Sequence, residues 1–150
     1  MTVRLLRHAT VWIDIGGHRL LVDPMLDPPG ARAPVRGTPA ERPNPLVPLP
    51  VSTDEALEGV DAVLLTHTHV DHIDAAGVTA LLPRGLPVFC QPPDLADLGE
   101  LGLDLRAVPE QSCAAQPCHA CRSQSTSSKN NVPATGFALY GAMGLKPSDL

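Results

Sequence analysis

The sequence predicts an α/β (α+β) fold, and two observations carry that prediction. Short β-prone runs alternate with segments that begin on helix-capping residues, from the N-terminus to about residue 110. The chain has 150 residues, of which 43% are apolar, so it is long enough for one domain with a core. Residues 111–131 contain no Val, Ile, Leu, Met or aromatic residue. We therefore expect a folded region over residues 1–110 and a divergent, poorly ordered tail over residues 111–150.

The first elements of the predicted fold are three consecutive strands. Residues 2–6 and 10–15 are β-prone, and the two adjacent glycines that follow are a typical signal for a tight hairpin turn. Residues 20–22 predict the third strand, which ends at Asp23. Residues 24–50 then hold nine of the seventeen prolines. A loop of that length usually either carries function or is disordered, so a substrate-shaping loop and a flexible insertion both stay open.

The next elements alternate helices with buried-type strands. Ser52 and Glu55 have the spacing of a capping box, and Asp74 can cap a further helix that Pro83 ends. The predicted elements are helices that begin near residue 53 and that span residues 75–82 and 94–101, and strands over residues 61–65, 87–90 and 103–108.

Composition and charge exclude several classes of protein. The formal net charge of −5 argues against a nucleic-acid partner, because binding phosphates needs a basic face. No basic-then-apolar leader opens the chain, and no apolar run reaches membrane-spanning length, so we expect a cytoplasmic protein without a membrane span. Disulfides are then not expected. We interpret Cys113, Cys118, His119 and Cys121 as chance residues of the tail, with a small redox or zinc module as the alternative.

The residues that point to chemistry are His67, His69, Asp71 and His72, directly after a predicted strand. In extended backbone, side chains at i and i+2 share a face, so two neutral imidazoles can hold one Zn²⁺ at about 2.0–2.1 Å. Asp71 and His72 follow as the chain turns into a helix and can point at a second, adjacent metal ion. Zinc lowers the pKa of water that it binds to about 7, so such a site supplies hydroxide without a protein nucleophile.

This segment resembles a known family. Residues 66–72, which read T-H-T-H-V-D-H, resemble the H-x-H-x-D-H signature of the metallo-β-lactamase superfamily. The strand end at Asp23 resembles the early aspartate of that family. Residues 7–10 and 15–17 resemble the opening of the branch that contains L-ascorbate-6-phosphate lactonase-like and N-acyl-phosphatidylethanolamine phospholipase D-like hydrolases. The resemblance covers residues 1–110, the N-terminal half of such a domain.

The resemblance implies a fold and a metal site. The family fold is an αββα sandwich of two similar halves with metals at their junction, and this chain would form one half. His67 and His69 would bind the first zinc ion, and Asp71 and His72 the second. Mn²⁺ or Fe²⁺ could replace zinc. Asp71 would also act in catalysis by orienting the attacking hydroxide.

Two further residues are implied beside these ligands. Asp23 would hydrogen-bond the histidine loop and so fix the geometry of the ligands, or it would only end the strand. His8 would face the site, or it would be a satisfied structural histidine.

The family's second half supplies three more ligands, which are a histidine, a bridging aspartate and a final histidine. His119 is the only histidine after His72 in this chain. The resemblance therefore implies a truncated zinc-dependent hydrolase of a small-molecule ester, lactone or phosphodiester, and leaves its activity open. The alternative is a non-catalytic fragment that binds metal or a partner without turnover. A lone half would expose one face of its sheet, which predicts self-association.

Overall fold

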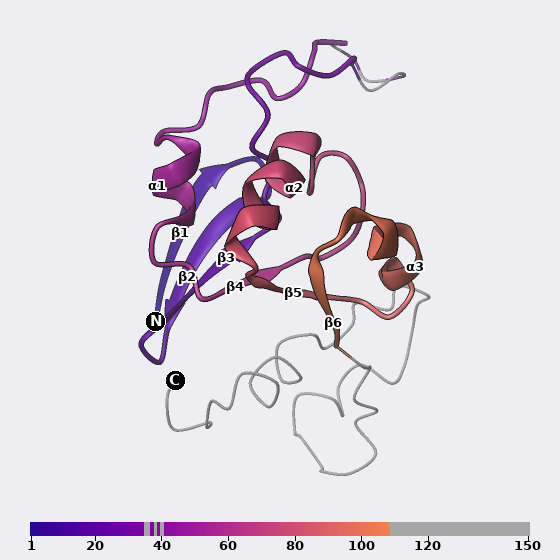
Figure 1. The fold of residues 1–150 in the computed structure, drawn as a ribbon. Coiled ribbons are helices and arrows are strands. Elements are labelled where there is room, and N and C mark those ends of the chain that lie inside the picture. The colour runs from indigo at the N-terminus through magenta and orange to yellow at the C-terminus, as the bar shows by residue number, and fades with distance from the viewer. Residues whose placement is uncertain (35–36, 38, 40, 109–150) are drawn as a thin grey trace, which may run out of the picture.

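The computed structural model describes residues 1–34, 37, 39 and 41–108 (Figure 1). They form a six-stranded mixed sheet in which each strand pairs with its sequence neighbours, so the predicted α/β class is confirmed. The strands are β1 (Thr2–Arg7), β2 (Thr10–Ile15), β3 (His18–Val22), β4 (Ala62–Leu64), β5 (Pro87–Cys90) and β6 (Asp104–Ala107). β1 to β3 are antiparallel, whereas β3 to β6 run parallel. The predicted tail over residues 111–150 lies outside the described residues.

Short helices connect the parallel strands. They are α1 (Thr53–Leu57), α2 (Ala75–Leu81) and α3 (Asp94–Leu98), with 3-10 turns η1 (Leu82–Arg84) and η2 (Gly99–Leu101). The predicted capping box is confirmed, since Ser52 and Glu55 each bond the other's backbone N–H. The prediction that a helix ends at Pro83 is confirmed for the α-helix, since α2 stops at Leu81 with Leu82 as its C-cap. The chain then passes through Pro83 in η1, because proline fits an early helical position where no N–H is needed, and this turn ends at Gly85 with φ of 56°. Within the described ranges, none of the helices is long and apolar enough to cross a membrane.

The core lies mainly between the sheet and the helices. Side chains alternate between the two faces of a strand, so alternate residues point at the helices. The cluster on that face combines strand residues with helix residues, among them Trp12, Leu21, Val63, Val88, Leu57, Leu81 and Leu98. A second buried cluster, on the opposite face, contains Ile15, Leu20, Ala62, Phe89 and Val108. Val3 and Leu5 of β1 are exposed, and self-association through such apolar surface stays a prediction.

The proline-rich segment 24–50 contains no helix or strand among its described residues. Arg7 holds both of its ends: the buried guanidinium donates to the carbonyl of Met25 and, at 3.2 Å, to that of Val47. Burial lowers the pKa of Arg7, and Asp74 and Asp27 act against that shift. The segment therefore begins and ends at fixed points of the sheet. Its role in shaping a substrate pocket stays a prediction.

The start of that segment also packs on the N-terminus of α2. Asp74 Oδ2 accepts from the Asp27 N–H at 2.8 Å, and Asp27 Oδ1 accepts from the Ala76 N–H at 3.2 Å. A Cβ atom at Gly77 would lie 2.2 Å from the carbonyl oxygen of Pro24, so only glycine permits this approach. The point at which the chain leaves the histidine segment and enters α2 is thereby fixed.

Candidate metal centre

The histidine segment is the loop that connects β4 to α2, at the carboxyl end of β4. β3 and β4 are parallel, so Asp23, which follows β3, lies beside this loop. The Asp23 N–H donates to the Leu64 carbonyl at 3.0 Å and extends the pairing of the two strands. Within the loop, the His72 N–H donates to the His69 carbonyl at 2.9 Å and closes a turn. The loop is therefore a turn held against the end of the neighbouring strand.

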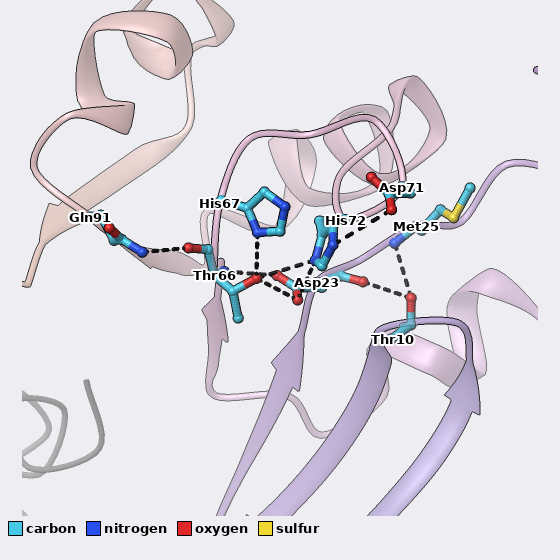
Figure 2. A network of polar contacts seen from close by, with 8 residues as sticks. All are labelled: Thr10, Asp23, Met25, Thr66, His67, Asp71, His72 and Gln91. Carbon is cyan, nitrogen blue, oxygen red and sulfur yellow. Dashed lines mark hydrogen bonds and ion pairs between the residues drawn. The ribbon is translucent and has the colours of Figure 1, made fainter. Parts of the chain in front are cut away.

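The Asp23 carboxylate is the main anchor of this loop (Figure 2). Its Oδ1 accepts from the Thr66 N–H at 2.8 Å, and its Oδ2 accepts from the Thr66 hydroxyl at 2.8 Å and contacts His72 Nδ1 at 2.8 Å. Its own carbonyl accepts from the Thr10 hydroxyl at 2.6 Å. The backbone of Asp23 has a φ of 46°, which is uncommon for a residue other than glycine, and these bonds hold it there.

The same bonds decide which imidazole nitrogens remain free. A carboxylate only accepts, so His72 Nδ1 carries the proton that faces Asp23. The Thr66 hydroxyl donates its single proton to Asp23. It therefore accepts a hydrogen bond from His67 Nδ1, which lies 3.0 Å away. In the neutral form of each ring, the nitrogen left without a proton is then Nε2. An imidazole in this state, held through its other nitrogen, is the usual form of a metal ligand.

Three side chains of the loop bring potential ligand atoms together. One ligand atom each from His67, His69 and Asp71 lies within 4.8 Å of the others. His67 is half-buried, whereas His69 and Asp71 are exposed. His72 Nε2 lies 3.7 Å from Asp71 Oδ2, so the fourth predicted ligand is adjacent. Two imidazoles and a carboxylate are a donor set that fits zinc, and also Mn²⁺ or Fe²⁺. The division of these residues between two metal ions stays a prediction.

His8 makes a different contact. It lies in the turn between β1 and β2 with a φ of 50°, and its Nε2 accepts from the Leu46 N–H at 3.1 Å. This bond attaches the proline-rich segment to the sheet. It fits the structural alternative for His8, and a role at the metal site stays a prediction.

The structure adds residues that the motif did not reveal. Thr66 links Asp23 to His67, and Gln91 Nε2 donates to the Thr66 carbonyl at 2.8 Å. Thr66 directly precedes the first histidine, which was a signal in the sequence. Gln91 is the first residue after β5, at the edge where parallel strands end together, and that position was also a signal. Thr10 gave none.

The described residues therefore form a mixed α/β sheet that carries, at the end of a parallel strand, a histidine- and aspartate-rich loop that could hold a metal ion. A family model described as the beta-lactamase superfamily domain matches residues 18–142. The chain belongs to this superfamily. The match extends past residue 110, beyond the described residues, and a division of the chain at that residue stays a prediction, as does the branch within the superfamily.

Relatives and solved structures agree with this assignment. The chain is 39% identical over 92 residues to UPF0173 protein YddR of Bacillus subtilis (strain 168), which covers 61% of this chain and 36% of that protein. It is 32% identical over 84 residues to a UPF0173 metal-dependent hydrolase of Aeropyrum pernix, covering 56% of this chain and 27% of that protein. A crystal structure of isothiocyanate hydrolase from Delia radicum gut bacteria superimposes with a TM-score of 0.68 at 34% identity. That comparison covers 75% of this chain and 43% of the other.

The chain therefore spans less than half the length of each of these relatives. The family and the fold follow from the comparisons. The activity, the substrate and the partners are matters of proposal.

Proposed function

We propose that this chain acts as a zinc-dependent hydrolase of the β-lactamase superfamily on a small-molecule ester, lactone or phosphodiester. The observation that carries the proposal is the convergence of His67, His69 and Asp71 in the loop after β4. The preset tautomer of His67 supports it, because the nitrogen left free is the one available to a metal ion. Mn²⁺ and Fe²⁺ are alternatives to zinc.

Each residue has a separate task in this proposal. His67 and His69 bind the ion through ring nitrogens, and Asp71 and His72 bind a second ion beside it. When bound, the metal acidifies a water molecule and polarises the bond to be broken. The Asp71 side chain is 61% exposed, so its carboxylate is free to accept a hydrogen bond from the attacking water and to orient it. Asp23 holds the loop still while this happens.

The substrate class rests on two observations. The net charge of −5 disfavours a polyanionic partner such as nucleic acid. The structural neighbour from Delia radicum gut bacteria is named an isothiocyanate hydrolase, and a second neighbour, from Veillonella parvula, a possible metal-dependent hydrolase. Small molecules with an electrophilic carbon or phosphorus, isothiocyanates included, are therefore the substrates to screen.

A second candidate is a protein that binds metal without turnover. It is favoured by one feature of the described residues: the three converging donors come from a single loop, and two of them are exposed. A site of that kind leaves much of the metal open to solvent, whereas catalytic zinc usually has three protein ligands in a shaped cavity.

The test is the zinc content of size-resolved protein, measured for the wild type and for the double variant His67→Ala/His69→Ala. His18→Ala is the matched control, because His18 lies at the β2–β3 hairpin and pairs with Asp61 at 3.4 Å. We expect near-stoichiometric zinc in the wild type and the control, and zinc loss in the double variant. Hydrolysis of lactones, phosphodiesters and isothiocyanates by the loaded protein then separates the two candidates. Undiminished zinc in the double variant would exclude the histidine loop as the metal site of either candidate.

A further inference from the structure

The connection from β5 to α3 faces the histidine loop from the side away from β3. Gln91 is the first residue of this connection, and its amide reaches the Thr66 carbonyl at 2.8 Å (Figure 2). The neighbouring Leu65 N–H donates to the Phe89 carbonyl at 2.8 Å, which is a backbone bond between the ends of β4 and β5. The Gln91 side chain adds the next bond between these two segments. The residue held in this way is the one directly before His67.

Asp94 approaches the same limb of the loop from the first turn of α3. Its Oδ1 lies 3.5 Å from the hydroxyl of Thr68, the residue between His67 and His69. Its Oδ2 is buried and has no hydrogen-bond partner among the residues that the structure describes. The carboxylate also raises the pKa of the buried Cys90 thiol, after the larger effect of burial itself. Asp94 is half-buried, and its carboxylate therefore lies toward the loop and β5 with one oxygen buried.

We propose that Gln91 and Asp94 are positioning residues for metal binding, which together set the place of the His67–His69 limb. This inference rests on the proposed function. Residues 66–74 form no strand or helix, so side chains that reach the loop decide where its backbone lies. Asp23 holds the loop at Thr66 and His72, and Thr68 contacts Asp94 instead. Residues that orient metal ligands in this indirect way typically change metal affinity by about 10- to 100-fold when they are removed.

The first arm of the test needs no metal. Amide hydrogen exchange is measured on the metal-free full chain, for the wild type, Gln91→Leu, Asp94→Asn and the control Asp97→Asn. Asp97 lies on the same helix and is exposed, so its variant changes charge by the same amount away from the loop. We expect faster exchange over residues 66–72 in Gln91→Leu and Asp94→Asn. Exchange in β1 and β2 should stay unchanged, which shows that the variants fold.

The second arm measures Zn²⁺ affinity by competition with a chromophoric chelator, together with the visible absorption of the Co²⁺ form. We expect about tenfold weaker Zn²⁺ binding and an altered Co²⁺ spectrum for Gln91→Leu and Asp94→Asn, with no change for Asp97→Asn. Gln91→Glu keeps the shape of the side chain but sets an acceptor against the Thr66 carbonyl, so it should weaken binding at least as much as Gln91→Leu.

The outcomes separate this inference from the proposed function. A wild type that binds no zinc overturns the proposed function, and with it a role of these residues in metal binding. If the wild type binds zinc and both variants bind as the control does, the inference is overturned and the proposed function stands. Faster exchange without weaker binding also overturns it, because the two residues would then support only the fold of the loop.

Discussion

The two sides of the histidine loop are held in different ways. On the β3 side, both Asp23 carboxylate oxygens are used, in three contacts of 2.8 Å, and the side chain is 3% exposed. On the β5 side, Gln91 makes one bond of 2.8 Å, Asp94 makes one contact of 3.5 Å, and an Asp94 oxygen has no partner among the described residues. Both carboxylate oxygens on the β3 side therefore accept hydrogen bonds, whereas on the β5 side one carboxylate oxygen is left without a donor among the described residues.

The predicted metal ligands also differ in how firmly their rings are held. The rings of His67 and His72 are fixed through Nδ1 by Thr66 and Asp23. The described residues form no hydrogen bond to the ring of His69, which packs edge-on against His67 at 4.6 Å between centroids. His67 and His72 are therefore already oriented before a metal ion binds, whereas the ring of His69 would have to be ordered by the ion. The free energy of that ordering reduces the affinity for the ion.

The largest effect is expected from breaking the β3 side. Asp23→Ala removes the acceptor of three hydrogen bonds in a buried position, so the free energy of unfolding of metal-free protein should fall by about 3 kcal/mol. Gln91→Leu removes one hydrogen bond and should cost about 1 kcal/mol. Urea unfolding followed by circular dichroism measures both. Equal costs would contradict the contrast between the two sides.

A smaller effect is expected from Thr66, where the two sides meet. Thr66→Val keeps the shape of the side chain but removes the hydroxyl that links Asp23 to His67. The proton of His67 then lacks its acceptor, and Zn²⁺ affinity should fall by about tenfold. Thr66→Ser keeps the hydroxyl and should bind as the wild type does. If valine and serine behave alike in chelator competition, the tautomer of His67 is not set by this residue.

Independence of the two sides gives a further test. Asp23 and Asp94 share no hydrogen-bond partner, so the unfolding costs of Asp23→Asn and Asp94→Asn should add to within about 0.5 kcal/mol in the double variant. The four proteins of this cycle are compared by the same urea unfolding. A larger coupling would mean that the loop transmits strain from one side to the other.

The β3 side and the β5 side were also not equally accessible from the sequence. Strands β1 to β3 and the loop ligands follow from local signals: β-prone runs, a glycine pair and four ligand residues within six positions. The role of Asp23 was implied by the resemblance of this strand end to the early aspartate of the family. No role was predicted for Gln91, because it lies 25 residues beyond Thr66 and meets it only after β4 and β5 have paired in parallel. The place of Gln91 after a predicted strand was a signal, but its partner Thr66 depends on this tertiary pairing and leaves no local pattern.

The smallest effect concerns Cys90, which reports on the direction of Asp94. Burial and, second, the Asp94 carboxylate raise the pKa of this thiol, so less thiolate is present at a given pH than in an exposed cysteine. With the three other cysteines replaced by serine, Cys90 in the folded protein should react with a disulfide reagent at pH 8 at roughly a tenth of the unfolded rate or less. The rate should rise only at higher pH.

In that background, Asp94→Asn removes the negative charge and should move the rise toward lower pH, whereas Asp97→Asn should leave it in place. The shift is expected to be small, because burial, the larger cause, is unchanged. If Asp94→Asn leaves the pH dependence of the Cys90 reaction rate unchanged, the carboxylate does not stay beside Cys90. It would then also be too mobile to hold Thr68, and the β5 side of the loop would depend on Gln91 alone.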